Sequence, residues 1–331
     1  MSEEREYSFL VDDEEAGERL DAWLSDRIPE LSRSRIQKAV KAGEVLVDGK
    51  PAKKVSTRLD GGEKVTLRFN PPQPPGASPE DIPIDIVYED ESLLVVNKAA
   101  GMVVHPAPGN QTGTLVNALL HHCRDLSGVG GVLRPGIVHR LDGGTSGLLV
   151  VAKDDETHIA LSRQLMERTV KRIYFSIVHG SMPEARGVID LPVGRSKSDR
   201  KKMGVLSSGG RQAITSYYVL DTFGPLQYIK LSLGTGRTHQ IRVHLAHMGH
   251  PVLGDPVYGG RKIRKGMLDK VELDLVRKTL SMIERQALHA GALSFVHPKL
   301  EREMRFEAPV PDDMGSVLSC LRDAYSEDRE D

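Results

Sequence analysis

The sequence predicts an α+β protein in two parts: a small N-terminal module and a larger domain with a mixed, mainly antiparallel sheet. The chain of 331 residues is long enough for two domains. A proline-rich stretch interrupts it near residue 75. Beyond that stretch, short apolar and β-branched runs come in groups, without the regular strand–helix alternation of a doubly wound fold.

The proline-rich stretch marks the domain boundary. Residues 70–79 contain five prolines, which neither a helix nor an interior strand accommodates, so we expect a semi-rigid linker. The predicted segments are an acidic N-terminal segment at 1–16, a basic module at 17–70, a linker at 71–80, a large domain at 81–310 and an acidic C-terminal segment at 311–331.

Charge is distributed unevenly along the chain. The net charge is −1, but residues 1–16 and 301–331 each carry −6, whereas residues 17–70 carry +4. The total charge therefore does not argue against a nucleic-acid partner. The two cysteines, Cys123 and Cys320, form neither a metal-binding pair nor a disulfide framework. Because no export signal or long apolar run is visible, we expect a cytoplasmic protein.

The basic module carries a helix with positive charges at regular spacing. Ser32 and Gly43 are suitable capping residues for a helix over Ser34–Ala42. A basic helix alone is more often a solvated face than a binding surface. However, the run LSRSRIQKAVKAGEVLVDGKPA resembles the S4 RNA-binding domain, and the resemblance extends over residues 17–70. It implies that four side chains face RNA phosphates: Arg33, Arg35, Lys38 and Lys53.

The larger domain contains short strands and longer helices. Strands are predicted at Leu93–Val96, Gly147–Ala152, Arg172–Val178, Ala213–Leu220 and Gln227–Leu233. Helices are predicted at Thr114–Cys123, Glu156–Arg168, Thr238–Met248 and Asp269–Arg285.

One acid stands out on a loop between two apolar strands. Asp142 is followed by Gly143 and Gly144, which allow a sharp turn and the close approach of a ligand. Thr145 then offers a hydroxyl before the buried strand begins. Such an acid either caps its own turn or does chemistry, and composition alone favours the turn.

A second segment leaves a strand through Gly-Thr-Gly and enters a helix. Thr238 is predicted as its N-cap and Gly249 as its C′ residue. Arg237 then stands at the start of the helix, where a carboxylate can meet both a guanidinium and free N–H groups. Such a pairing would keep a partly buried carboxylate ionised.

Four ordered motifs carry a resemblance to one family. The run HRLDGGTSGLLVVAK at 139–153 is similar to the HRLDxxTSGLLxxAK signature of the RluA family of pseudouridine synthases. The run TGRTHQIRVHLAHMGHPVLGDPVYG at 235–259 is similar to that family's third motif. Residues 94–110 resemble its first motif and residues 171–180 the remaining one, and RQALHA at 285–290 also matches. The resemblance covers about residues 17–310. It departs from the family at Gly143-Gly144, where Lys-Asp is common, and at Ala99, where Pro is usual.

The resemblance implies the reaction and the roles of the site residues. Asp142 would be the catalytic aspartate, Arg237 its partner, and Tyr174 the residue against the target base. The other pocket residues would be His139, Arg140, Leu141, Thr145 and His239. The reaction adds no atoms and no electrons, so we expect neither a metal nor an organic cofactor. The implied substrate is a set of uridines in structured RNA, above all large-subunit (23S) ribosomal RNA or its assembling particle; a synthase acting on transfer RNA is the alternative.

Other features allow further interpretations. Lys197, Arg200, Lys201 and Lys202 form a second basic cluster, which is either a solvated loop or, as we favour, an RNA contact. A zinc enzyme is disfavoured because the histidines at 239, 244, 247 and 250 lack the HExxH pattern. An RNA-binding or ribosome-assembly protein with secondary or lost catalysis is the other alternative. We expect a monomer.

Overall fold

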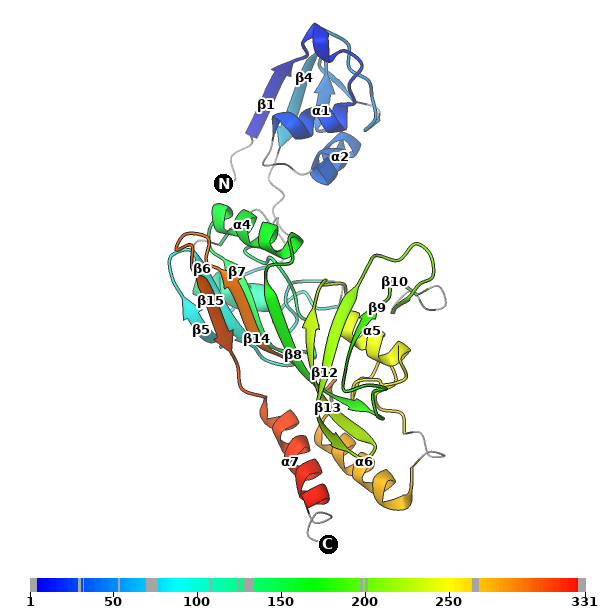
Figure 1. The fold of residues 1–331 in the computed structure, drawn as a ribbon. Helices are drawn as coiled ribbons and strands as arrows, with labels where there is room; N and C mark the ends of the chain where they lie inside the picture. The colour runs from blue at the N-terminus through cyan, green and yellow to red at the C-terminus, as the bar shows by residue number, and fades with distance from the viewer. Residues whose placement is uncertain are drawn as a thin grey trace. The chain divides into compact units, whose positions relative to one another are not determined.

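The computed structural model divides the chain into two compact units, Met1–Pro75 and Gly76–Asp331 (Figure 1). The structure describes residues 5–28, 31, 33–52, 54–69, 77–107, 109–123, 126–127, 134–196, 199, 202–263 and 268–326. Most of the predicted linker at 71–80 lies outside these residues. Within the described residues, no helix has both the length and the apolar character that crossing a membrane requires.

The N-terminal unit is a four-stranded sheet with two α-helices, in the strand order β1-β4-β2-β3. Its core forms around Trp23, Leu24 and Ile36, all fully buried. The elements are β1 (Arg5–Leu10), η1 (Asp13–Glu15), α1 (Leu20–Arg27), α2 (Arg33–Ala42), β2 (Val45–Val47), β3 (Lys50–Pro51) and β4 (Lys64–Phe69).

The predicted acidic N-terminal segment is part of this unit. Strand β1 pairs antiparallel with β4 along its whole length, from Arg5 opposite Phe69 to Leu10 opposite Lys64. Tyr7 and Phe9 pack against the core of the unit, while Glu6, Ser8 and Leu10 are exposed. This alternation is typical of an edge strand, and the surrounding acids obscured it in the sequence.

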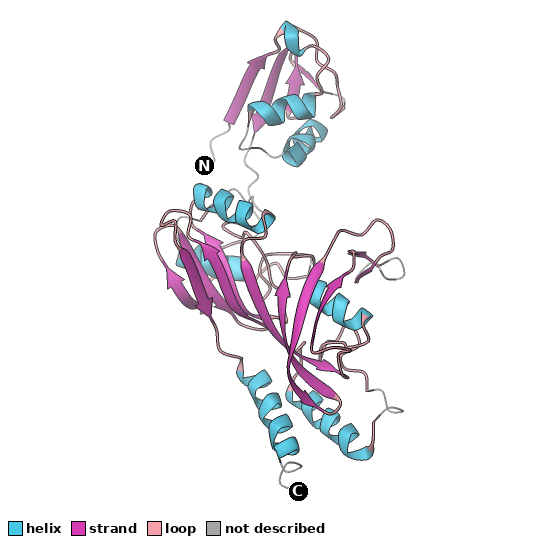
Figure 2. Cartoon of the chain, in the orientation of Figure 1, coloured by secondary structure: helices cyan, strands magenta, loops and turns pink. Residues whose placement is uncertain are grey.

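The larger unit contains a nine-stranded sheet with the order β5-β6-β7-β14-β8-β13-β12-β9, and β15 pairs with β14 (Figure 2). Strand β14 is parallel to β7, whereas the other strand pairs of the sheet are antiparallel, so the predicted mixed, mainly antiparallel sheet is confirmed. The strands are β5 (Asp85–Glu89), β6 (Leu93–Lys98), β7 (Ser146–Ala152), β8 (Lys171–His179), β9 (Arg186–Asp190), β12 (Ile214–Phe223), β13 (Leu226–Leu233), β14 (Leu288–Val296) and β15 (Glu303–Glu307). A separate ribbon pairs β10 (Val193–Arg195) with β11 (Met203–Val205).

Helices bury both faces of this sheet. Alternate residues of β6 and β7 enter two different clusters: Leu149 packs into the main core and Leu148 into the second. Burial on both faces explains the nearly continuous apolar sequence of these strands. Helix α4 covers the second cluster through Leu161. The helices are α3 (Leu115–His122), α4 (Asp155–Met166), α5 (Gln240–His247), α6 (Lys270–Met282) and α7 (Asp312–Ser326).

Two predictions about the ends of elements need correction. The acidic C-terminal segment is not separate from the large domain, because α7 buries Met314, Val317 and Leu321 in the main core. Helix α5 does not begin after an N-cap at Thr238. Its N-cap is His239, in the left-handed conformation with φ 55°, and its first residue is Gln240.

Candidate active site

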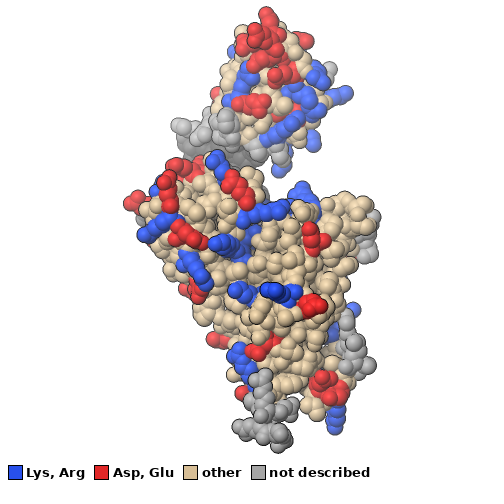
Figure 3. Space-filling view, viewed as in Figure 1, with Lys and Arg blue, Asp and Glu red and all other residues tan. Residues whose placement is uncertain are grey.

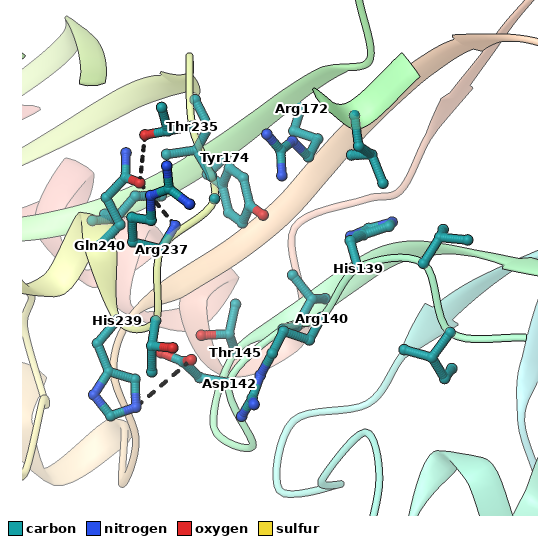
Figure 4. Close-up of a pocket in the computed structure, with 18 of the residues that line it drawn as sticks. His139, Arg140, Asp142, Thr145, Arg172, Tyr174, Thr235, Arg237, His239 and Gln240 are labelled. Carbon is teal, nitrogen blue, oxygen red and sulfur yellow. Dashed lines mark hydrogen bonds and ion pairs between the residues drawn. The ribbon is translucent and has the colours of Figure 1, made fainter. Parts of the chain in front are cut away.

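A pocket of about 600 Å³ opens where the loop before β7 meets β8, the β13–α5 turn and the end of α4. It contains the predicted catalytic residues Asp142 and Tyr174 (Figure 4). Among the described residues that line it, Asp142 is the one acid and six are arginines. These are Arg134, Arg140, Arg168, Arg172, Arg237 and Arg242. Figure 3 shows Lys and Arg side chains spread over the viewed face of the larger unit. The pocket is thus suited to an anionic ligand.

The carboxylate of Asp142 is held by Arg242. The Arg242 Nη1 donates to Asp142 Oδ2 at 3.0 Å. The same guanidinium donates through Nε and Nη2 to Asp255, at 2.7 and 2.9 Å. Arg242 and Asp255 are buried, while Asp142 remains partly open to the pocket. One arginine therefore joins two carboxylates, of which only Asp142 can meet a substrate.

The predicted pairing of Asp142 with Arg237 is wrong. Arg237 lines the pocket, but its Nε donates to the carbonyl oxygen of Gln212 at 3.1 Å. The physical reason is the late start of α5. Arg237 lies in the turn before the helix, and Arg242, the third helical residue, faces the Asp142 loop.

The loop that carries Asp142 is fixed by contacts to its carbonyl oxygens. The carbonyl of Gly143 accepts from Gly101 N at 2.9 Å and from Lys98 Nζ at 3.3 Å. The carbonyl of Gly144 accepts from Arg285 Nη1 at 3.1 Å. Neither Gly143 nor Gly144 has a positive φ. The glycine pair therefore does not serve a left-handed turn, and neighbouring segments hold the loop in place.

Tyr174 is buried beside the catalytic loop. Burial raises the pKa of its hydroxyl; the Arg172 charge opposes this increase and the Asp142 charge adds to it. In Figure 4 the ring lies between Asp142 and Arg172 and projects into the pocket. A neutral phenol with an apolar ring at this place can stack on a base.

The other predicted pocket residues take different positions. His139 accepts from Val150 N at 3.2 Å, and burial followed by the Arg172 charge lowers the pKa of its imidazole to about 3. Arg140 is exposed at the pocket, whereas Leu141 is buried in the main core.

Thr145 and His239 lie on two sides of the carboxylate (Figure 4). The buried Thr145 hydroxyl accepts from Gln286 Nε2 at 3.1 Å. The His239 ring bonds the Tyr258 hydroxyl at 2.8 Å through Nδ1, and its Nε2 lies 3.8 Å from Asp142 Oδ1. Burial lowers the pKa of His239, so its imidazole is a neutral neighbour of the carboxylate.

The predicted RNA-contact residues are only partly described. Lys53, Lys197, Arg200, Lys201 and the side chain of Arg35 lie outside the described residues. Lys38 is exposed, in agreement with a contact surface. Arg33 donates twice to the buried Asp21, at 3.1 and 3.2 Å. Arg19 binds the same carboxylate, so one acid is shared by two arginines. Lys202 lies 3.8 Å from Asp199.

The histidines around α5 do not converge on one point. His244 bonds Thr215 Oγ1 and the Leu191 carbonyl, both at 2.9 Å, whereas His239 turns to Tyr258. Within the described part of the chain, the one group with possible metal-ligand geometry consists of Glu89, His122 and Cys123. None of these three lines the pocket.

Comparison with known proteins places this geometry in a family. The RNA pseudouridylate synthase family model matches residues 92–247, and the S4 domain model matches residues 18–65. The chain is 45% identical to an uncharacterized RNA pseudouridine synthase of Bacillus subtilis, covering 95% of this chain and 97% of that protein. The chain belongs to the RNA pseudouridine synthase family. A ribosomal large subunit pseudouridine synthase D of Neisseria meningitidis is 46% identical, covering 96% of this chain and 83% of that protein.

Solved structures agree with membership of this synthase family. Human RNA pseudouridylate synthase domain containing 1 superposes with a TM-score of 0.54 at 26% identity, covering 73% of this chain and 89% of that one. The chain is therefore an RNA pseudouridine synthase with an N-terminal S4 domain. This disfavours the alternative of an RNA-binding or ribosome-assembly protein with secondary or lost catalysis.

Three residues that organise the synthase site were not predicted from the sequence. Arg242 and Asp255 both lie within the TGRTHQIRVHLAHMGHPVLGDPVYG run, and Lys98 lies within the first motif. Asp255 followed by Pro and preceded by Gly gave no separate signal, because the same pattern is typical of an ordinary turn. Lys98 is only 2% exposed, which is unusual for a lysine and detectable only in the fold.

Proposed function

We propose that this synthase converts uridines of large-subunit ribosomal RNA into pseudouridine, with Asp142 as its catalytic carboxylate and with no metal or organic cofactor. The observation that carries the proposal is the arrangement of charge: among the described residues that line the pocket, a single carboxylate, paired with Arg242, is accompanied by six arginines. The ribosomal substrate is supported by similarity to synthases named for the large subunit. A synthase with this substrate would act in the cytoplasm.

The reaction breaks the N1–C1′ bond of uridine, turns the base and joins it to the sugar through C5. A carboxylate can assist as nucleophile at C1′ or as base at C2′, and both roles require it to be ionised. The Arg242 guanidinium donates a charge-assisted hydrogen bond to Asp142 Oδ2, which orients the carboxylate. Thr145 N also donates to the Asp142 carbonyl at 3.0 Å, which fixes the turn that presents the carboxylate.

The substrate uridine must leave its stack to reach Asp142. Extrusion costs a few kcal/mol, and phosphate contacts can offset this cost. The arginines of the pocket and the basic S4 domain supply cations for such contacts. Tyr174 presents an apolar ring on which the extruded base can stack.

The test is to map pseudouridine in total RNA from cells that lack this gene and express either the wild type or Asp142→Asn. Carbodiimide-dependent reverse-transcription stops should appear in large-subunit ribosomal RNA with the wild type and disappear with the variant. Stops confined to transfer RNA would overturn the substrate assignment. Equal stops with both proteins would overturn the role of Asp142.

A further inference from the structure

Arg172 is a cation without a partner inside the pocket. In the described part of the chain, no hydrogen bond or ion pair reaches its guanidinium, and its buried Nε has no acceptor. Four buried side-chain atoms among the described residues lack a partner, and three of them belong to residues lining this pocket. These are Arg172 Nε, His139 Nδ1 and His105 Nδ1. Unpaired buried polar atoms are costly, and Arg172 Nε can only donate, so their concentration here indicates a ligand that offers acceptors.

The fold holds the Arg172 guanidinium beside Tyr174. Arg172 and Tyr174 are two residues apart on β8, so their side chains leave the same face of the strand. Gly236 provides the space opposite: a Cβ there would lie 2.7 Å from Arg172 Nη1. The arginine is therefore positioned by the β13–α5 turn and not by an acid.

The positions of Asp142, Tyr174 and Arg172 in the pocket indicate which group of the substrate would accept a hydrogen bond from Arg172. Tyr174 lies between Asp142 and Arg172 (Figure 4). If Asp142 acts at the sugar and the base lies on Tyr174, Arg172 faces the base and not the sugar. A uracil ring offers two carbonyl oxygens there. When the C1′–N1 bond breaks, its electron pair leaves with the base, and the negative charge is shared by N1 and both carbonyl oxygens.

Resting on the function proposed above, we infer that Arg172 is a further catalytic residue, which binds the carbonyl oxygens of the extruded uracil and stabilises the uracil anion. The sugar is meanwhile bonded to Asp142 or has lost its C2′ proton to it. A half turn of the base about its N3–C6 line exchanges N1 with C5 and O2 with O4. The guanidinium fork, with several N–H donors, can bind a carbonyl oxygen before and after this turn. The electron pair then forms the C5–C1′ bond, while the bond from C1′ to Asp142 breaks or, in the other route, Asp142 returns its proton to C2′. Finally C5 loses its proton and N1 gains one, so the product is neutral pseudouridine with an intact ribose.

Leaving-group stabilisation can be separated from simple binding with 5-fluorouridine. Fluorine at C5 lowers the proton affinity of the uracil anion, so the base leaves with less help. The probes are two RNA fragments around the uridine mapped as described above, with uridine or 5-fluorouridine at that position. Single-turnover loss of the starting nucleoside is measured after digestion, and RNA affinity is measured separately. Wild-type reaction of the uridine fragment is the control for the proposed function itself.

We expect Arg172→Met to slow the uridine fragment by about 10²- to 10³-fold, the range for removing a donor to a developing anion. The factor by which Arg172→Met slows the reaction should be at least about 10 times smaller with the 5-fluorouridine fragment, and the variant's affinity for RNA should change by less than about threefold. Gly236→Ala, which displaces the guanidinium but leaves it in the chain, should give the same pattern in weaker form. The matched control Arg237→Met should weaken RNA affinity and slow both fragments equally.

Thermal unfolding distinguishes catalysis from a structural role. Because Arg172 is a partly buried cation whose Nε has no acceptor, Arg172→Met should melt no lower than the wild type. If Arg172→Met melts at a lower temperature and slows both fragments by the same factor, Arg172 is a structural residue. If it binds RNA more weakly and slows both fragments by the same factor, Arg172 contacts a phosphate. Either result would overturn the inference.

Discussion

The shared arginine between Asp142 and Asp255 predicts a large loss of stability when it is removed. In Arg242→Gln, three charge-assisted hydrogen bonds of 2.7, 2.9 and 3.0 Å are lost. Asp255, which is fully buried, keeps its charge without a cation. Leaving one partner of a buried pair uncompensated costs about 3–5 kcal/mol of unfolding free energy. Chemical denaturation at pH 7 measures this cost, and turnover should fall by about 10²-fold or more.

The dependence on pH tests the cause of that loss. In the wild type, burial raises the pKa of Asp255, but the Arg242 guanidinium and the backbone N–H groups of Val257 and Tyr258 together outweigh burial, and the net shift is downward. Without Arg242, only the two backbone N–H groups oppose burial, and the pKa of Asp255 rises. The folded variant then binds a proton that the unfolded chain releases, so its stability should increase as pH falls from 8 towards 5. The wild type should not show this increase.

A second substitution separates stability from catalysis. In Arg242→Gln/Asp255→Asn the unpaired buried charge is gone, so most of the lost stability should return. Activity should stay low because Asp142 still has no cation. The reasoning is refuted if Arg242→Gln unfolds like the wild type, or if the double variant regains turnover.

Three further predictions concern single residues. Arg237→Gln should reduce the slope of log affinity for RNA against log salt by about 1, with less than about 1 kcal/mol change in unfolding free energy; a change like that of Arg242→Gln would contradict the geometry. Burial, followed by the Arg285 charge, lowers the pKa of Lys98 to about 7. Between pH 7 and pH 10 Lys98 is therefore protonated in the unfolded chain but neutral in the folded one. As pH rises through this range, the free energy of unfolding of the wild type should increase relative to that of Lys98→Met, by up to about 1.4 kcal/mol per pH unit. Chemical denaturation measures it, and the same pH dependence in both proteins would refute the prediction. Asp313→Asn weakens the ion pair that holds Arg285 at 2.6 and 2.7 Å, and should lower turnover by up to about 100-fold with unchanged RNA affinity; an affinity loss alone would argue against it.

Local sequence patterns predicted most of the fold. The predicted strands and helices of the larger domain are present, with ends displaced by up to three residues. The sequence patterns did not predict the elements in which many charged residues lie between the apolar positions that are buried. In β1 only Tyr7 and Phe9 face the core, and in α7 the buried positions lie among acids. Composition averages over both faces of such an element, so an amphipathic segment at a terminus looks like an acidic tail.

The site was predicted as a set of segments but not as a set of contacts. Asp142 and Tyr174 do line one pocket, because each lies in a motif that the fold brings there. The partner of Asp142 was assigned to the wrong arginine, since Arg237 and Arg242 are five residues apart and the choice depends on where the helix begins. His239, a non-glycine residue with φ 55°, delays that start. No propensity rule predicts a left-handed histidine there.

Three of the matching segments share one physical reason for occurring with the segment that carries Asp142. Each supplies a group that holds the Asp142 loop: Lys98 binds the Gly143 carbonyl, Arg242 the carboxylate itself, and Arg285 the Gly144 carbonyl. Lys98 and Arg285 repel each other, since the Arg285 charge lowers the pKa of Lys98 and the Asp142 charge raises it. The carboxylate is therefore the counter-charge that makes this cluster of cations tolerable. Neutralising Asp142 should loosen its own loop, so Asp142→Asn is expected to lower loop order as well as abolish turnover, and Asp142→Glu is the better probe of geometry alone.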